Sequence, residues 1–165
     1  MTPDPAGPLV RAARPEDAPL LAEYNLRMAW ETEKQRLDPA RVSQGVLNGL
    51  NRPDRCRYYV VELQGRLVAQ AMVTYEWSDW RNGEIWWLQS VYVHPDFRRR
   101  GLFRRLWNHI ETLAREAPGV VGLRLYVEQD NRSGQSVYQR LGLRPAGYLV
   151  YERMLEGPGQ EKETD

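Results

Sequence analysis

The order of its predicted elements places this chain in the α/β (α+β) class, with a mixed, mostly antiparallel central sheet of six to seven strands and about four flanking helices. Apolar runs bounded by Gly, Asn and Asp indicate the strands. Segments with apolar residues at helical spacing indicate the helices. Because antiparallel strands come first and a β-α-β-α-β order follows, we expect helices on both faces of the sheet.

The first predicted elements are a short strand and two helices. Residues 9–13 are expected to form the strand, and Pro15 suits the first turn of a helix with an acidic start. Asp38 and Pro39 mark the entry of the second helix. A loop at residues 51–54 then leads into the main run of strands.

Three strands joined by short turns form the centre of the predicted sheet. Residues 57–63 and 67–77 are joined through residues 64–66, which form a hairpin-like turn around a glycine. The pair Asn82-Gly83 predicts a second tight turn into a strand at residues 84–93.

The last third of the chain alternates helices and strands. We expect a helix at about 99–117, a strand at 120–127, a helix at 133–141 and a final strand at 148–155. The polar tail 156–165 is expected to be disordered. Residues 1–155 are therefore predicted to form a single domain.

Composition excludes several classes of protein. The 23 basic and 22 acidic side chains nearly balance, whereas a general nucleic-acid binder has a strong basic excess. The lone Cys56 cannot form an internal disulfide, which is consistent with a reducing compartment. The N-terminus lacks a signal-peptide pattern, and no apolar run approaches the ~18 residues of a membrane span. His94 and His109 have no metal-ligand partner at a useful spacing. We expect a cytoplasmic protein without a metal, a nucleic-acid partner or a membrane partner.

The most informative segment is VYVHPDFRRRGLFRRL, at residues 91–106, where a strand leads through a turn into a helix. A helix N-terminus with unsatisfied N–H donors suits a phosphate group. Gly101 permits close backbone approach to a ligand. The alternative is that the arginines are only solvated charges. Five arginines lie around this glycine: Arg98, Arg99, Arg100, Arg104 and Arg105.

This segment resembles the coenzyme A-binding motif of the GCN5-related N-acetyltransferases (GNAT), in which Arg/Gln-x-x-Gly-x-Gly/Ala follows a strand. Arg98, Gly101 and Phe103 occupy the three motif positions. Phe103 departs from the pattern, since a small residue is usual there. A side chain of that size has to point away from the diphosphate and into the core.

A second block of the same family follows a later strand, with Asn-x-x-Ala, then a tyrosine, then Gly-Phe. Asn131 and Tyr138 match this block, Gly134 replaces the small residue and Leu143 replaces the aromatic one. The two blocks stand in the family's order, and the resemblance covers roughly residues 9–155. The chain is identified on these motifs as a GNAT member.

The resemblance implies transfer of an acetyl group from acetyl-CoA to a primary amine of a small molecule or peptide, and it is compatible with a homodimer. The cofactor-binding residues that it implies are Val91, Tyr92, Val93, Arg98, Arg99, Arg100, Gly101, Leu102, Phe103, Arg104, Asn131, Ser133 and Tyr138. In this scheme main-chain groups of Val91 and Val93 pair with the pantetheine arm. Val91 or a neighbour donates an N–H to the thioester oxygen.

Tyr138 is the family-matched general acid for the leaving thiolate, because a phenol with a pKa near ~10 is protonated at neutral pH. The alternative is a tyrosine whose ring only packs in the core. The general base is less defined, since Trp87 stands where the histone-modifying branch has a glutamate. Glu84 and Glu76 are the nearby carboxylates, and a water relay through Gln89, Ser90 or a backbone carbonyl is the alternative to direct base catalysis. Strand alternation places Glu84 on the face opposite Gln89.

The acceptor amine is expected to meet an aromatic wall, by cation–π contact or burial. At least half of the aromatic cluster at residues 75–87 is expected to pack under helices instead. The end of the first predicted helix falls where family members place a lid. The expected acceptor-binding residues are Met28, Trp30, Tyr75, Trp77, Trp87 and Gln89.

Two other functions compete with this reading. A non-catalytic acyl-CoA-binding or regulatory module would explain the missing glutamate and the bulky Phe103. A small nucleic-acid-binding domain would use the arginines with exposed tryptophans, although the balanced charge counts against it.

Overall fold

The computed structural model describes residues 7–155, whose contacts divide after Glu128 into two compact units. The first unit contains the sheet and most helices, and the second contains one further helix. The single domain expected for residues 1–155 therefore stays a prediction. The predicted disordered tail, 156–165, lies outside the described residues.

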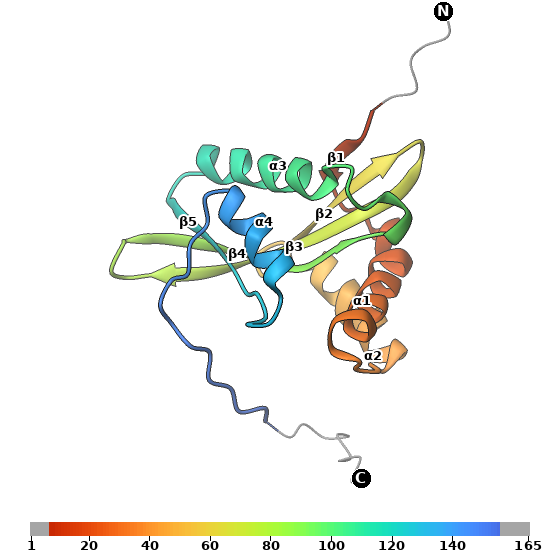
Figure 1. Cartoon of the computed structure of the whole chain (residues 1–165), viewed down its shortest axis with the longest axis horizontal. Helices are drawn as coiled ribbons and strands as arrows, with labels where there is room; N and C mark the ends of the chain where they lie inside the picture. The colour runs from red at the N-terminus through yellow and green to blue at the C-terminus, as the bar shows by residue number, and fades with distance from the viewer. Residues whose placement is uncertain (1–6, 156–165) are drawn as a thin grey trace, which may run out of the picture. The chain divides into compact units, whose positions relative to one another are not determined.

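The first unit is built on a five-stranded sheet in the order β1-β2-β3-β4-β5 (Figure 1). All neighbours are antiparallel except β4 and β5, which are parallel. The strands are β1 (Leu9–Ala12), β2 (Cys56–Leu63), β3 (Arg66–Ser78), β4 (Gly83–Val93) and β5 (Val120–Leu125). The helices of this unit are η1 (Pro15–Asp17), α1 (Ala18–Glu33), α2 (Pro39–Leu50), η2 (Pro95–Phe97) and α3 (Leu102–Glu116). Within residues 7–155, no helix is long and apolar enough to cross a bilayer.

Helices cover both faces of this sheet, as predicted. Leu21 of α1 and Val46 of α2 join Tyr58 and Val60 of β2 in one buried cluster. The intervening strand residues point to the other face, where α3 lies (Figure 1). α3 buries the apolar stripe Leu102, Leu106, Trp107, Ile110 and Ala114.

Local sequence signals explain the turns and the helix entry. Gln64 and Gly65 both have positive φ, 51° and 73°, as the tight turn between β2 and β3 requires. The connection between β3 and β4 is longer, because residues 79–82 form the loop and Gly83 already pairs with Ser78 in the sheet. The hairpin is confirmed there, but not the tight turn at Asn82-Gly83. The Asp38 side chain accepts a hydrogen bond from the Ala40 backbone N–H at 3.0 Å and so caps α2, as predicted.

The predicted helix at 99–117 begins three residues too early. Arg99 and Gly101 have φ values of 62° and 70°, in the left-handed region, so the α-helix starts only at Leu102. β5 likewise ends at Leu125, two residues before the predicted boundary.

The predicted strand at 148–155 is wrong, because that segment is described and contains no strand. Its apolar side chains are exposed; Val150, the least exposed of the large ones, is 66% exposed. An apolar run of this length is compatible with a strand, but a strand also requires a hydrogen-bonded neighbour. The described sheet therefore has five strands rather than six to seven.

The second unit contains α4, Arg132–Arg140. Asn131 caps this helix, and its side-chain Oδ1 accepts from the Gly134 backbone N–H at 2.8 Å. A Cβ at Gly134 would lie 2.8 Å from Asn131 Nδ2. The asparagine and the small residue three positions later thus form one capping unit, which explains their spacing.

Candidate active site

β4 and β5 separate halfway along β4, and this separation is the central feature of the site. Their parallel register runs from Glu84↔Val120 to Leu88↔Leu125, where β5 ends. Residues 89–93 of β4 continue without a strand partner on that side within residues 7–155. Main-chain groups on such an edge can bind an extended, amide-containing ligand. Val91 to Val93, expected to contact the cofactor, lie on this edge.

A β-bulge lies in the same segment. In the register with β3, Met72 faces Gln89 and Gln70 faces Tyr92, so two residues of β4, Ser90 and Val91, oppose one residue of β3. Ser90 adopts φ 52°, an uncommon backbone conformation for a residue other than glycine. A bulge of this kind removes backbone groups from the sheet ladder and redirects them.

Gln70 holds this bulge from inside the protein. Its side chain is fully buried, and its Nε2 donates to the Ser90 carbonyl at 3.1 Å and to Asn25 Oδ1 of α1 at 2.8 Å. Its Oε1 has no hydrogen-bond partner among the described residues. A buried amide oxygen without a donor costs about 1–3 kcal/mol, so this position favours an added donor such as a water.

The arginine-rich loop delivers the first turn of α3 to the open end of β4. Gly101 is the N-cap residue and offers no side chain to the N–H groups of that turn. No atom lies within 4 Å of the place where a Gly101 Cβ would stand. Arg99, Arg100 and Arg104 are exposed around it. The free N–H groups of the helix start, the positive charge of these arginines and the open space at Gly101 suit an anionic group.

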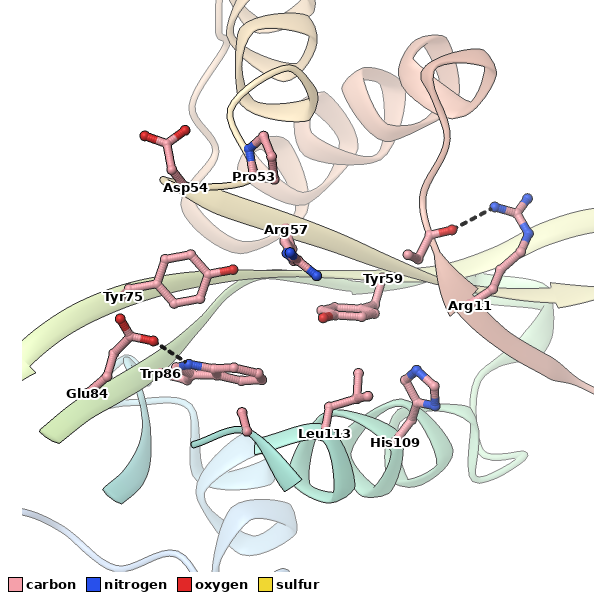
Figure 2. A pocket seen from close by; sticks show the side chains of 12 residues that line it. Arg11, Pro53, Asp54, Arg57, Tyr59, Tyr75, Glu84, Trp86, His109 and Leu113 are labelled. Carbon is pink, nitrogen blue, oxygen red and sulfur yellow. Dashed lines mark hydrogen bonds between the residues drawn. The ribbon is translucent and has the colours of Figure 1, made fainter. Parts of the chain in front are cut away.

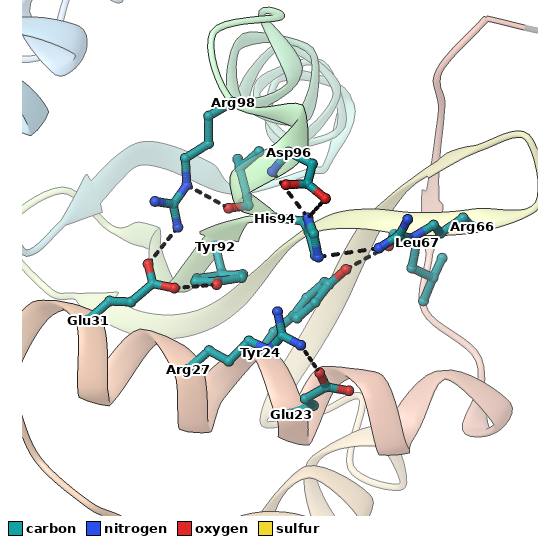
Figure 3. A network of polar contacts seen from close by, with 11 residues as sticks. Glu23, Tyr24, Arg27, Glu31, Arg66, Leu67, Tyr92, His94, Asp96 and Arg98 are labelled. Carbon is teal, nitrogen blue, oxygen red and sulfur yellow. Dashed lines mark hydrogen bonds and ion pairs between the residues drawn. The ribbon is translucent and has the colours of Figure 1, made fainter.

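Arg98 has protein partners, shown in Figure 3. Its Nη2 contacts Glu31 Oε2 of α1 at 2.6 Å, and its Nε donates to the Val93 carbonyl at 2.9 Å. The Tyr92 hydroxyl donates to the other oxygen of Glu31 at 2.7 Å. The network joins α1, the end of β4 and the loop, so the proposed contact of Arg98 with a cofactor stays a prediction.

The Tyr92 side chain faces α1 and not the open edge of β4. Its ring centroid lies 5.0 Å from that of Tyr24, and the side chain is buried. Burial, followed by the hydrogen bond to Glu31, raises the pKa of Tyr92 to about 12. Its expected part in cofactor binding can therefore come from the backbone alone.

One group of the predicted acceptor residues lies on the α1 face of the sheet. Thr74 pairs with Cys56 and with Trp87 in register, which places Trp87 on the face that carries the α1–α2 cluster. Gln89 lies on the same face, where its Nε2 donates to Thr74 Oγ1 at 2.7 Å.

Residues that the motifs do not mark complete this face. Glu76 accepts from Trp87 Nε1 at 2.6 Å and from Arg124 Nη1 at 3.0 Å. The Tyr126 ring lies 4.5 Å from that of Trp87, and the Arg124 guanidinium lies 5.9 Å from it. The result is an aromatic surface with one carboxylate and one guanidinium beside the point where β4 and β5 separate.

The other group lies on the opposite, α3 face. Tyr75, Glu84 and Trp86 line a hollow of about 680 Å³ under α3, together with His109 (Figure 2). Glu84 accepts from Trp86 Nε1 at 2.8 Å. Tyr75 and Glu84 are thus separated from Gln89 by the sheet. Alternation correctly predicted this for Glu84, but the wall expected to contain both Tyr75 and Trp87 is not one surface.

The outer part of the β3–β4 hairpin is exposed. Trp77 is 66% and Trp80 86% exposed, whereas Trp86 is buried and Tyr75 and Trp87 are half-buried. Two of the five aromatic residues are thus exposed, and the expectation that at least half of the cluster packs under helices stays a prediction. On α1, Trp30 is exposed beneath Lys34 and Arg36, and Met28 is half-buried. Phe103 is also half-buried, short of the core position expected for it.

The second unit contains Asn131, Ser133 and Tyr138 on α4 and its cap. Asn131 is used by the helix cap, so its side-chain oxygen is already bonded. Burial raises the pKa of Tyr138, which keeps the phenol protonated at neutral pH. This protonation state is the one that a general acid requires.

Sequence reasoning missed Gln70, Glu31 and Arg124. Gln70 could have been found, since it is a polar residue in the otherwise apolar run from Leu67 to Val73. Glu31 and Arg124 carried no signal, because their partners, Arg98 and Glu76, are 67 and 48 residues away in the chain. Within the described residues, no group of three or more His, Cys, Asp or Glu could hold a metal ion.

Comparison with known proteins assigns the family. The Acetyltransferase (GNAT) family matches residues 18–143, which include the open edge of β4, the arginine loop and α4. The chain belongs to the GNAT family. The predicted family and the α/β fold class are therefore confirmed.

Individual relatives agree with this GNAT assignment. A possible acetyltransferase from Clostridium difficile 630 has a TM-score of 0.85 and 38% identity, covering 92% of this chain and 100% of that one. An acetyl-CoA complex of a predicted acetyltransferase from Clostridium acetobutylicum shares the fold, with a TM-score of 0.73, 16% identity, and coverage of 88% and 96%. A thialysine N-epsilon-acetyltransferase from Caenorhabditis elegans is 36% identical over 64 residues, 39% of each chain. The matched part spans about two fifths of that relative.

The residues of this GNAT protein fit the coenzyme of its family. An open strand edge can pair with an amide-containing arm, and an uncapped helix start with a glycine can receive a diphosphate. Both features lie at the same end of β4, joined by residues 94–101.

Proposed function

We propose that this GNAT protein transfers an acetyl group from acetyl-CoA to a primary amine of a small molecule or peptide. The observation that supports this most directly is the open edge of β4 at residues 89–93, which ends beside the uncapped start of α3. Acetyl-CoA, when bound, supplies an activated thioester acyl group. The balanced charge and the single cysteine support a small-molecule or peptide acceptor in the cytoplasm.

The chain's own groups divide into a binding part and a reacting part. The first-turn N–H groups of α3 and the arginines around Gly101 bind the diphosphate. Main-chain groups of Val91 and Val93 bind the amide-containing arm. The backbone N–H of Val91, placed by the Ser90 bulge, stabilises negative charge that develops on the carbonyl oxygen.

The amine acceptor approaches the α1 face, at the aromatic surface beside the separation of β4 and β5. Trp87 and Tyr126 provide stacked rings, and Glu76 provides a carboxylate that attracts an ammonium group. Arg124 can bind an acidic group elsewhere on the acceptor. The thialysine N-epsilon-acetyltransferase relative supports an amino-acid-like amine as the first class to test.

Proton transfer completes the proposal. Tyr138 donates a proton toward the leaving sulfur, a role consistent with its raised pKa. The ammonium form of the acceptor titrates near ~10.4, so a proton must leave before attack. Gln89 and the Ser90 carbonyl hold a water that carries this proton away. Glu84 is the weaker candidate, because it lies on the α3 face.

Two measurements test this function. Acetyl-CoA binding is measured by calorimetry, and absence of binding at millimolar concentration contradicts the proposal. Turnover is then measured with a panel of amines, amino acids and peptides. Binding without transfer to any of them favours the non-catalytic acyl-CoA module instead.

Replacing Tyr138 by phenylalanine tests the general acid. We expect kcat to fall about 100-fold with acetyl-CoA affinity within about twofold, because a positioned proton donor contributes roughly that much. Tyr151→Phe is the matched control, since Tyr151 is 89% exposed and lies in the same unit. An unchanged kcat in Tyr138→Phe assigns that tyrosine a packing role only.

A further inference from the structure

The hollow under α3 contains only one group named for acetyl transfer, Glu84, the weaker candidate for the general base. Its volume of about 680 Å³ falls within the range of small-molecule sites. It is lined from β1, β2, β3 and β4 and the loop before β2 on one side and from the α3 segment on the other, all in the first unit. His109 and Leu113 mark its position on α3. Leu113 follows Gly101 by twelve residues, about 18 Å along a helix, so the hollow is separate from the diphosphate site.

The walls of the hollow are aromatic. The Tyr75 ring meets Trp86 edge-on at 5.9 Å, and the Tyr59 ring meets His109 edge-on at 5.7 Å. Tyr59 and Trp86 are buried, so these faces are fixed by the core. Flat apolar ligands pack well against such rings.

Three hydrogen-bond donors converge on the centre of the hollow. Figure 2 shows the hydroxyls of Tyr59 and Tyr75 directed into it, with the Arg57 guanidinium between them. Burial raises the pKa of Tyr59, and it raises that of Tyr75 to about 12, with the Arg57 charge opposing both shifts. Both phenols therefore remain protonated and can donate to an anion at physiological pH.

Two of the other charged side chains that line the hollow form ion pairs: Arg11 binds Asp17, and Asp54 binds Arg52 and Arg55. Glu84 accepts from the Trp86 indole, a neutral donor that does not compensate its charge. Arg57, in contrast, forms no salt bridge with a carboxylate of residues 7–155. The hollow thus offers a cation and two phenol donors at its centre and aromatic faces around them.

We propose that this hollow is a second ligand site, which binds a small aromatic carboxylate. The carboxylate accepts from Arg57, Tyr59 and Tyr75, and the ring lies against Trp86. A guanidinium with two flanking donors suits a carboxylate in both charge and geometry. The site does not depend on the proposed acetyl transfer, because none of these residues belongs to the open edge of β4 or the arginine loop.

The test uses 2-naphthoate as the probe and 2-naphthylmethylamine as its charge-reversed counterpart. Binding is followed in the full chain, with coenzyme A in excess so that the diphosphate site is filled. We expect a Kd on the order of 0.1–1 mM for the carboxylate, in line with a ligand of this size. The amine is expected to bind at least about tenfold more weakly. In NMR spectra the indole N–H signal of Trp86, assigned with Trp86→Phe, should shift, and that of Trp30 should not.

Matched variants separate this site from general surface charge. Arg57→Ala should weaken naphthoate about tenfold, because a charge-assisted bond is lost. Arg41→Ala, which removes an exposed arginine of α2 that does not line the hollow, should leave binding within twofold. Equal melting temperatures show that both variants are folded. The proposal is overturned if naphthoate does not bind, if the amine binds equally well, or if Arg57→Ala and Arg41→Ala behave alike.

Discussion

Replacing Glu31 by alanine removes the acceptor of two hydrogen bonds that connect α1 to the end of β4. The Tyr92 hydroxyl donates to one carboxylate oxygen at 2.7 Å, and Arg98 Nη2 donates to the other at 2.6 Å. Arg98 also donates to the Val93 carbonyl, so this carboxylate helps to fix the loop that leads into α3.

The two bonds contribute unequally to stability. Glu31 and Arg98 are 36% and 45% exposed, so solvent screening limits their ion pair to about 0–1 kcal/mol. Tyr92 is buried, and a buried hydroxyl without its acceptor costs about 1–3 kcal/mol. We therefore expect Glu31→Ala to lower the free energy of unfolding by about 2 kcal/mol. For a chain of this length that lowers Tm by about 4–8 °C.

A double-mutant cycle identifies the source of this loss. Urea unfolding is measured for Glu31→Ala, for Tyr92→Phe and for the pair. Because phenylalanine has no hydroxyl, Glu31→Ala should cost only about 0–1 kcal/mol in the Tyr92→Phe background. Glu33→Ala, an exposed glutamate at the end of α1, is the control. The reasoning is refuted if Glu31→Ala costs no more than Glu33→Ala, or if its cost is the same in both backgrounds.

Three further predictions concern the core, the α4 cap and pH. Leu106→Ala should lower the free energy of unfolding by about 2–5 kcal/mol in urea titrations, since Leu106 is fully buried on α3. Gly134→Ala should lower the free energy of unfolding by about 1 kcal/mol, because the added Cβ displaces the Asn131 cap. In an Asn131→Ala background the same change should cost nothing, and thermal melts of both pairs measure the difference. Burial raises the pKa of Asp17, but hydrogen bonds from Arg11 and the Arg14 backbone outweigh it, so the folded pKa lies below the ordinary 3.8. The contribution of Asp17 to the free energy of unfolding is therefore complete above that value and lost as pH falls below it. In Asp17→Asn the free energy of unfolding should fall less steeply at acidic pH than in the unchanged protein.

Sequence reasoning succeeded where a signal is local. The positive φ values at Gln64 and Gly65 follow from their turn, and the cap at Asp38 follows from its side chain. The spacing of Asn131 and Gly134 likewise reflects contacts within one helix turn.

Reasoning from residue type and spacing failed where a partner is distant in the chain. The largely apolar segment 148–155 was predicted to form a strand, but hydrogen bonding to a neighbour decides strand formation, and no strand is formed there within the described residues. The Ser90 bulge depends on Gln70 and Asn25, and neither lies near Ser90 in sequence.

The sequence by itself determined the GNAT family, the order of most elements and the loop at Gly101, because motifs, turns and caps act over a few residues. Only the tertiary structure decided which acceptor candidates share a face. One residue's shift along a strand reverses the direction of its side chain, so Trp86 lies under α3 while Trp87 faces α1. It also decided the charge pairing, since Glu31 reaches Arg98 only after β4 and α1 have packed together.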